Sequence, residues 1–113
     1  MTIENLKSQL DLLKILARPK SKYRKLIIQS ADKKLVQAIC ECIHNVLKGN
    51  INISESEKKR LKSYRSVLHE LIKKSTLKTK KKILIQRGGF LEVLLPAVIS
   101  GIASIISSAI SSS

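Results

Sequence analysis

The stretch SADKKLVQAICECIHNVLKG, residues 30–49, decides the fold class. Its apolar side chains recur at three- and four-residue steps, the spacing that places side chains on one face of an α-helix. The predicted face carries Leu35, Ile39, Cys42 and Val46, and it is widened by further apolar neighbours. A helix of this length with one apolar face needs other helices or a sheet to cover it.

Chemical signals mark where this helix and the next one begin and end. Ser30 is the expected N-cap, because a serine side chain accepts a hydrogen bond from an N–H group of the first turn. Gly49 follows the last apolar residues, at the position where glycine commonly terminates a helix. Ser54 and Glu57 have the spacing of a capping box, which predicts a second helix running to about Lys74.

Helical spacing is also present near the N-terminus. It predicts a helix from Ile3 to Ala17, which ends before Pro19 because the residue preceding a proline is pushed out of helical geometry. A short helix is expected around Leu26, and the apolar run 83–85 is predicted either to pack back on the helices or to form a strand. The sequence therefore predicts an all-α fold, a small helical bundle with a basic surface followed by a separate apolar C-terminal helix.

The distribution of charge divides the chain. It has 22 Lys and Arg against 8 Asp and Glu, a formal net charge of +14 over 113 residues. All 22 basic residues lie within residues 1–89, whereas the remainder contains a single charged residue, Glu92. This change predicts a basic helical domain over residues 1–75, a basic linker over 76–89 that ends in Gly-Gly, and an apolar tail helix over 90–113.

Positive charge of this size indicates a polyanionic partner, and nucleic acid and an anionic membrane surface are the two obvious candidates. The chain has two Tyr, one Phe and no Trp, so the aromatic platforms on which single-stranded bases stack are scarce. Contact with duplex phosphate, without sequence preference and most simply in DNA, is therefore favoured. The predicted nucleic-acid-binding residues form three clusters: Lys20, Lys22, Arg24 and Lys25; Lys58, Lys59, Lys62 and Arg65; and Lys78, Lys80, Lys81 and Lys82.

The apolar tail predicts a second kind of interaction. Ile99, Ile102, Ile106 and Ile110 share one helical face, which we predict to serve membrane contact or self-association. Three alternatives remain open: a buried or self-associating helix that makes a homo-oligomer, an interfacial helix that inserts into a membrane, and a transmembrane anchor. The rival function is accordingly a membrane-active or membrane-anchored protein with a basic body and an inserting tail.

No catalytic constellation is evident, and we predict a binding protein, not an enzyme, with no cofactor and no metal site. Cys40 and Cys42 point to different sides of a helix, so a disulfide between them is sterically poor. Buried or half-buried thiols in a reducing, intracellular setting are expected instead. His44 lies beside the apolar face of its helix and is expected to be half-buried.

The layout of the chain resembles that of a known class of viral protein. A basic body, the junction Ile83-Leu84-Ile85-Gln86-Arg87-Gly88-Gly89-Phe90-Leu91 and an apolar C-terminus are similar to small virion core or capsid-associated proteins of adenovirus-like DNA viruses and polinton (Maverick) elements. The resemblance implies a packaging role, a virion or host-nucleus location and contact of the tail with a capsid shell. It also implies that Gly88 and Gly89 are a processing site for an adenain-type protease, whereas a flexible hinge is the plainer interpretation of a double glycine.

Overall fold

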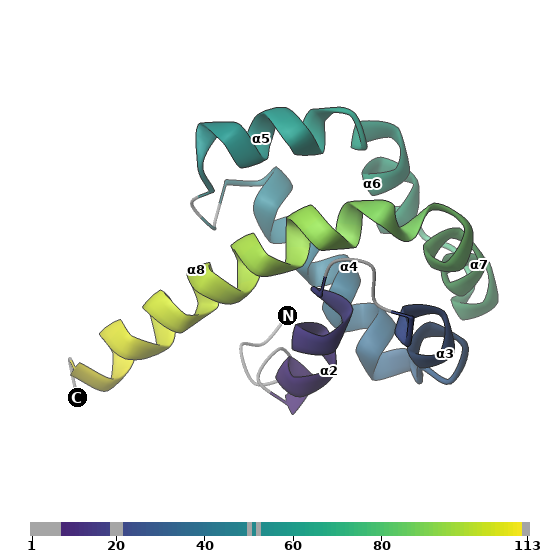
Figure 1. The fold of residues 1–113 in the computed structure, drawn as a ribbon, viewed down its shortest axis with the longest axis horizontal. Coiled ribbons are helices and arrows are strands. Elements are labelled where there is room, and N and C mark those ends of the chain that lie inside the picture. Colours follow the sequence, from purple (N-terminus) through teal and green to yellow (C-terminus); the bar gives the residue numbers. More distant parts are fainter. Residues whose placement is uncertain (1–7, 19–21, 50, 52, 112–113) are drawn as a thin grey trace.

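The structure, a computed structural model, describes residues 8–18, 22–49, 51 and 53–111, with side chains described as far as Gly101. Helices and turns make up this part of the chain and no strand occurs in it, so the predicted all-α fold is confirmed. In chain order the elements are α2 (Leu10–Leu16), α3 (Arg24–Gln29), α4 (Lys33–Leu47), α5 (Glu55–Lys62), α6 (Arg65–Ile72), α7 (Leu77–Arg87), the 3-10 turn η1 (Gly88–Phe90) and α8 (Leu91–Ser111), shown in Figure 1.

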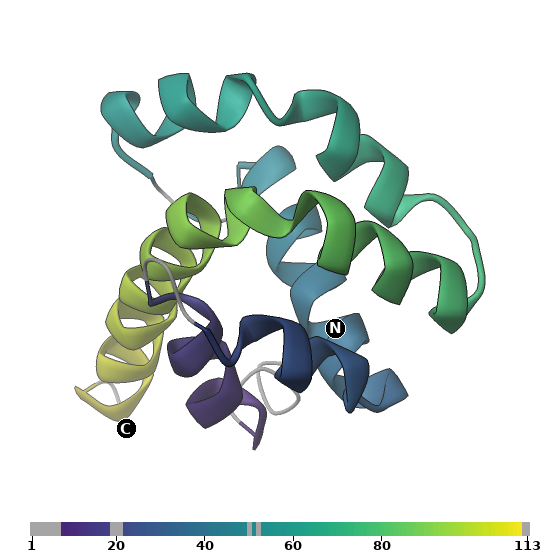
Figure 2. The same cartoon turned by 45° about the vertical axis from the view of Figure 1, so that its right-hand side comes forward.

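Helices α4 and α8 provide much of the hydrophobic core. Helix α8 packs against α2, α4 and α5, while α4 also contacts α6 and α7, so the shorter helices surround this pair (Figure 2). The face of α4 expected from the sequence is buried at Leu35, Ile39 and Cys42, and Val46 packs against the core half-buried. Burial of one face against neighbouring helices is what stabilises an amphipathic helix in water.

The ends of α4 follow local hydrogen bonding. Its N-cap is Asp32, whose Oδ1 accepts a hydrogen bond from the Leu35 N–H at 3.0 Å. The prediction of Ser30 was therefore wrong by two residues, because the Asp32 carboxylate takes the capping position and Ser30 instead ends α3. Gly49 has φ of 76°, a left-handed conformation that side chains disfavour, and it terminates α4 as predicted.

The capping box is confirmed, but the helix that it opens is shorter than expected. The Glu57 N–H donates to Ser54 Oγ at 3.1 Å and the Ser54 N–H donates to Glu57 Oε1 at 2.9 Å. The helix then breaks after Lys62, where the Ser63 hydroxyl donates to the Arg60 carbonyl at 2.9 Å and competes with the helical backbone bonds.

Residues 76–89, which we expected as a linker, are helical from Leu77 to Arg87. The Thr79 N–H donates to Thr76 Oγ1 at 3.1 Å, which caps the start of α7. Leu84 is buried and its neighbours Ile83 and Ile85 are half-buried, so this apolar run packs back on the helices rather than forming a strand. Helix α7 contacts α3, α4 and α6.

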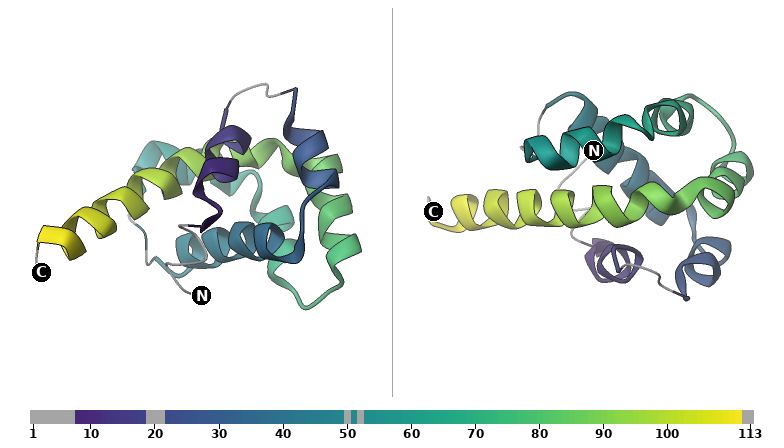
Figure 3. Two further views of the ribbon diagram at one scale, coloured as in Figure 1. Left: turned by 90° about the horizontal axis from the view of Figure 1, so that it is seen from below. Right: turned by 45° about the horizontal axis from the view of Figure 1, so that its top comes forward.

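The apolar C-terminal helix has two differently placed halves. Its first half lies in the core, with Leu91, Leu94, Leu95 and Val98 fully buried. Its second half projects away from the other helices, as Figures 1 and 3 show. The continuous stretch of α7, η1 and the first part of α8, Leu77–Gly101, is long and apolar enough to cross a membrane, with a mean hydropathy of 1.5 in its most apolar window. However, 50% of that window is buried inside the fold.

Candidate nucleic-acid interface

The fold brings two of the three predicted basic clusters together. Helices α3 and α7 pack side by side, and they run antiparallel. At one end the Arg24 guanidinium reaches Glu92, just beyond α7, and at the other end Lys81 reaches the carbonyl of Gln29. We call the resulting surface the α3–α7 edge and define it by its four exposed lysines, Lys22, Lys25, Lys78 and Lys82.

Arg24 and Lys81, two cations predicted to bind phosphate, have partners inside the protein. Arg24 Nη1 lies 3.2 Å from Glu92 Oε1, and both side chains are largely shielded from solvent. Lys81 Nζ donates to the carbonyl oxygens of Gln29 at 2.7 Å and Ala31 at 3.0 Å, which satisfies acceptors that the end of α3 leaves unpaired. These two side chains tie α3 to α7 and α8.

A shallow hollow of about 480 Å³ lies between α3 and α7. Leu77 and Ile85 line it with apolar side chains, and Lys78, Lys81 and Lys82 line it with charged ones. Lysine is a flexible point charge, suited to phosphate oxygens rather than to the bidentate recognition of a base. The edge therefore has the chemistry for contacting a nucleic-acid backbone.

Sequence reasoning missed two residues beside this edge. Tyr23 is 57% exposed between Lys22 and Arg24, and a tyrosine hydroxyl is one of the groups that donate to phosphate. Its position inside a basic run was the available signal. Lys33 lines a second hollow with Lys80, close to the start of α7. Only the packing of α4 on α7 brings these two lysines together.

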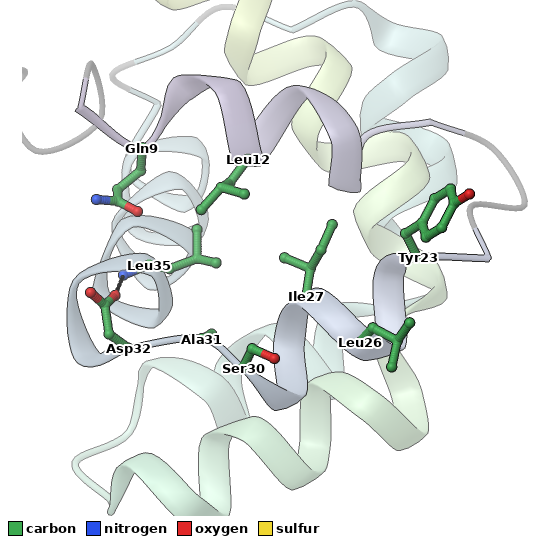
Figure 4. Close-up of a pocket in the computed structure, with 9 residues that line it drawn as sticks. All are labelled: Gln9, Leu12, Tyr23, Leu26, Ile27, Ser30, Ala31, Asp32 and Leu35. Carbon is green, nitrogen blue, oxygen red and sulfur yellow. Dashed lines mark hydrogen bonds between the residues drawn. The ribbon is translucent and has the colours of Figure 1, made fainter.

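Tyr23 also borders an apolar hollow of about 420 Å³ between α2 and α3 (Figure 4). Leu12, Ile27 and Leu35 point into this hollow, and Gln9 and Asp32 lie at its far side. Leu12 and Leu26 are 38% and 59% exposed there, which leaves an apolar strip next to the basic edge.

The third basic cluster lies apart from the α3–α7 edge. Lys58, Lys59 and Lys62 are exposed on α5, and Arg65 is exposed at the start of α6. Helix α5 packs against α8, on the opposite side of the molecule from α3 in Figure 1. Lys20, the remaining predicted contact, lies outside the described residues.

Most acidic side chains already have a structural role in the described part of the chain. Besides Glu92 with Arg24, Glu70 Oε2 pairs with Arg87 Nη1 at 2.8 Å and Glu55 Oε1 with Lys58 Nζ at 3.2 Å. Asp32 and Glu57 cap helices. Glu92, at one end of the α3–α7 edge, is thus paired with Arg24, and the four exposed lysines leave this edge with an excess of positive charge.

The double glycine lies in a folded junction. Gly88 is buried, η1 joins α7 to α8, and Phe90 is fully buried with its ring 6.3 Å from that of Tyr64. Proteases bind their substrates in extended form, so cleavage after Gly89 requires this junction to open. Ile99, the first of the four tail isoleucines, is half-buried, and the side chains of Ile102, Ile106 and Ile110 lie outside the described part of the chain.

The cysteines have the expected environment. Cys42 is buried, and burial raises the pKa of its thiol to about 12. Cys40 is half-buried, and burial raises its pKa too, against the opposing effect of Lys80. His44 is exposed, contrary to prediction, because one further residue along α4 turns its side chain about 100° away from buried Ile43. Within the described residues no group of three His, Cys, Asp or Glu side chains has an arrangement that could hold a metal ion.

Comparison of the chain with protein-family models, with curated proteins and with solved structures found no match. The functional argument therefore depends on the chemistry of the surface itself.

Proposed function

We propose that this protein binds duplex nucleic acid through its phosphates, without sequence preference, and that it acts as a DNA-condensing or packaging-associated component. The observation that carries the proposal is the α3–α7 edge, where packing joins two basic clusters far apart in the sequence. A duplex presents one negative charge for about every 1.7 Å of its axis, so a surface with several lysines neutralises several phosphates together. Each neutralised phosphate releases condensed counterions, which supplies the free energy of binding.

A binding experiment with two matched variants tests the proposal. The edge variant replaces Lys22, Lys25, Lys78 and Lys82 by Gln, and the α5 variant replaces Lys58, Lys59, Lys62 and Arg65 by Gln. Both variants remove four positive charges, so long-range attraction falls equally and only the contact surface differs. Affinity for two unrelated DNA duplexes is measured for each full-length chain across a salt series.

The edge variant is expected to lose up to about 3.6 from the slope of log affinity against log salt, about 0.9 for each phosphate contact. The α5 variant should keep most of the slope, and the two duplexes should give equal affinities. If both variants lost the same amount from the slope, the phosphate contacts would not be confined to the α3–α7 edge, and this surface assignment would be wrong. A wild-type chain that binds DNA no better than a soluble protein of ordinary charge would overturn the function itself.

A further inference from the structure

The second half of α8 is a helix that leaves the body of the protein. Leu94, Leu95 and Val98 hold the first half in the core, and Gly101 marks the last close contact described. An added Cβ at Gly101 would lie 2.5 Å from Ile51 Cγ2, so the helix and residue 51 touch closely at this point. Beyond it the helical backbone continues to Ser111 and projects from the other helices (Figure 3).

This projecting half is apolar, uncharged and short. Residues 102–111 consist of Ile, Ala and Ser alone. Ten helical residues extend about 15 Å, which is about half of the 30 Å hydrocarbon thickness of a bilayer. Spanning a membrane would require the first half of α8 as well, and that half carries the core residues Leu94, Leu95 and Val98. The length of the projecting segment suits one leaflet.

A basic rim lies where α8 leaves the body. Ile51, which touches Gly101, also lines a hollow of about 570 Å³ together with Leu61. The cations of the same hollow are Lys58, Lys62 and Arg65. The fold thus places three positive side chains around a hollow whose residue Ile51 touches the base of an uncharged apolar helix.

We propose that this end of the protein docks on an anionic lipid bilayer, with residues 102–111 inserted into one leaflet and Lys58, Lys62 and Arg65 on the lipid phosphates. Charge complementarity favours a bilayer over a second copy of the chain. A second copy of the chain carries the same net charge of +14, so the two copies would repel one another. An anionic surface attracts the three cations instead, and each contributes about fivefold to the affinity.

The test is cosedimentation of the full chain with phosphatidylcholine vesicles that contain or lack phosphatidylserine, with no nucleic acid present. Lys62→Gln with Arg65→Gln should weaken binding to the anionic vesicles about 25-fold, by the same fivefold for each cation. The matched control, Lys73→Gln with Lys74→Gln, removes two exposed lysines outside the hollow. It should weaken binding much less. Ile106→Glu with Ile110→Glu should abolish binding while leaving the helical circular dichroism and the melting temperature unchanged, because the helical backbone of this segment projects from the other helices (Figure 3).

Insertion depth is measured with a reporter tryptophan, because the natural chain contains no Trp. An Ile110→Trp chain should be quenched by brominated lipids in the leaflet to which it was added and not by those confined to the opposite leaflet. Equal binding to both vesicle types, equal effects of the two lysine pairs, or quenching from the far leaflet would each overturn the proposal. So would a dimer in lipid-free solution whose formation is lost in Ile106→Glu with Ile110→Glu. The lipid assay is independent of duplex binding, so either proposal can fail alone.

Discussion

Lys81 and Lys82 are adjacent in the sequence but should respond oppositely to replacement by methionine, which retains length and removes charge. Lys81 Nζ donates to the carbonyls of Gln29 at 2.7 Å and Ala31 at 3.0 Å, whereas Lys82 is exposed on the α3–α7 edge. A hydrogen bond from a charged donor contributes about 1.5–3 kcal/mol, and water at this half-buried site will replace part of it. We therefore expect Lys81→Met to lower the free energy of unfolding by about 2 kcal/mol.

For a chain of 113 residues, this loss corresponds to a melting temperature lower by about 8 °C, from the usual entropy of unfolding per residue. Lys82→Met should stay within about 0.5 kcal/mol of the wild type. Urea denaturation followed by circular dichroism measures both. In DNA binding the order reverses: Lys82→Met should lower the salt slope by about 0.9, and Lys81→Met should leave it unchanged. If Lys81→Met is as stable as the wild type and lowers the slope as Lys82→Met does, the structural role assigned to Lys81 is refuted.

Three further predictions concern packing, backbone and thiols. Gly101→Ala should destabilise the protein by about 1–3 kcal/mol in urea denaturation, since its Cβ would lie 2.5 Å from Ile51 Cγ2, and the cost should shrink in an Ile51→Ala background. Gly89→Ala should stabilise by up to about 1 kcal/mol, because the nearest side-chain atom, the Tyr64 hydroxyl, is 3.8 Å from the new Cβ; a loss of stability would contradict this. The stability contributed by the buried Cys42 thiol should be complete below its ordinary pKa of 9.0 and be lost as the pH rises toward about 12. Because Cys42 is buried and Cys40 is half-buried, a thiol reagent should label Cys40 before Cys42 in the native protein.

The fold class was predictable because local signals agreed with the tertiary structure. The apolar spacing of residues 30–49, the capping box at Ser54 and Glu57, and Gly49 each have a short-range cause, and each appears in the structure. The break after Lys62 was not predictable from apolar spacing, which continues through it. It depends on the Ser63 hydroxyl and on packing that brings Tyr64 to Phe90, a contact between residues far apart in the chain.

The sequence allowed the basic clusters of the candidate site to be predicted from their composition, but not how the fold arranges them on the surface. Density of Lys and Arg selected the clusters, but it could not separate Lys81, which binds backbone carbonyls, from Lys82, which is exposed. Nor could it show that the clusters around residues 24 and 80 share one surface while that of α5 lies beside α8. These distinctions arise from contacts across the chain, which no local pattern encodes.

Long-range ties between opposite charges also connect binding to folding. The Arg24–Glu92 contact joins residues 68 apart, and Arg87–Glu70 joins residues 17 apart. These ties hold α3, α6, α7 and α8 together against the mutual repulsion of a chain with net charge +14. A polyanion on the exposed lysines would remove much of that repulsion and bind the folded form in preference, so it should stabilise the fold by mass action. Since Glu92 and Glu70 are already paired with Arg24 and Arg87, a phosphate backbone bound to the four exposed lysines would relieve the repulsion without replacing these two pairs.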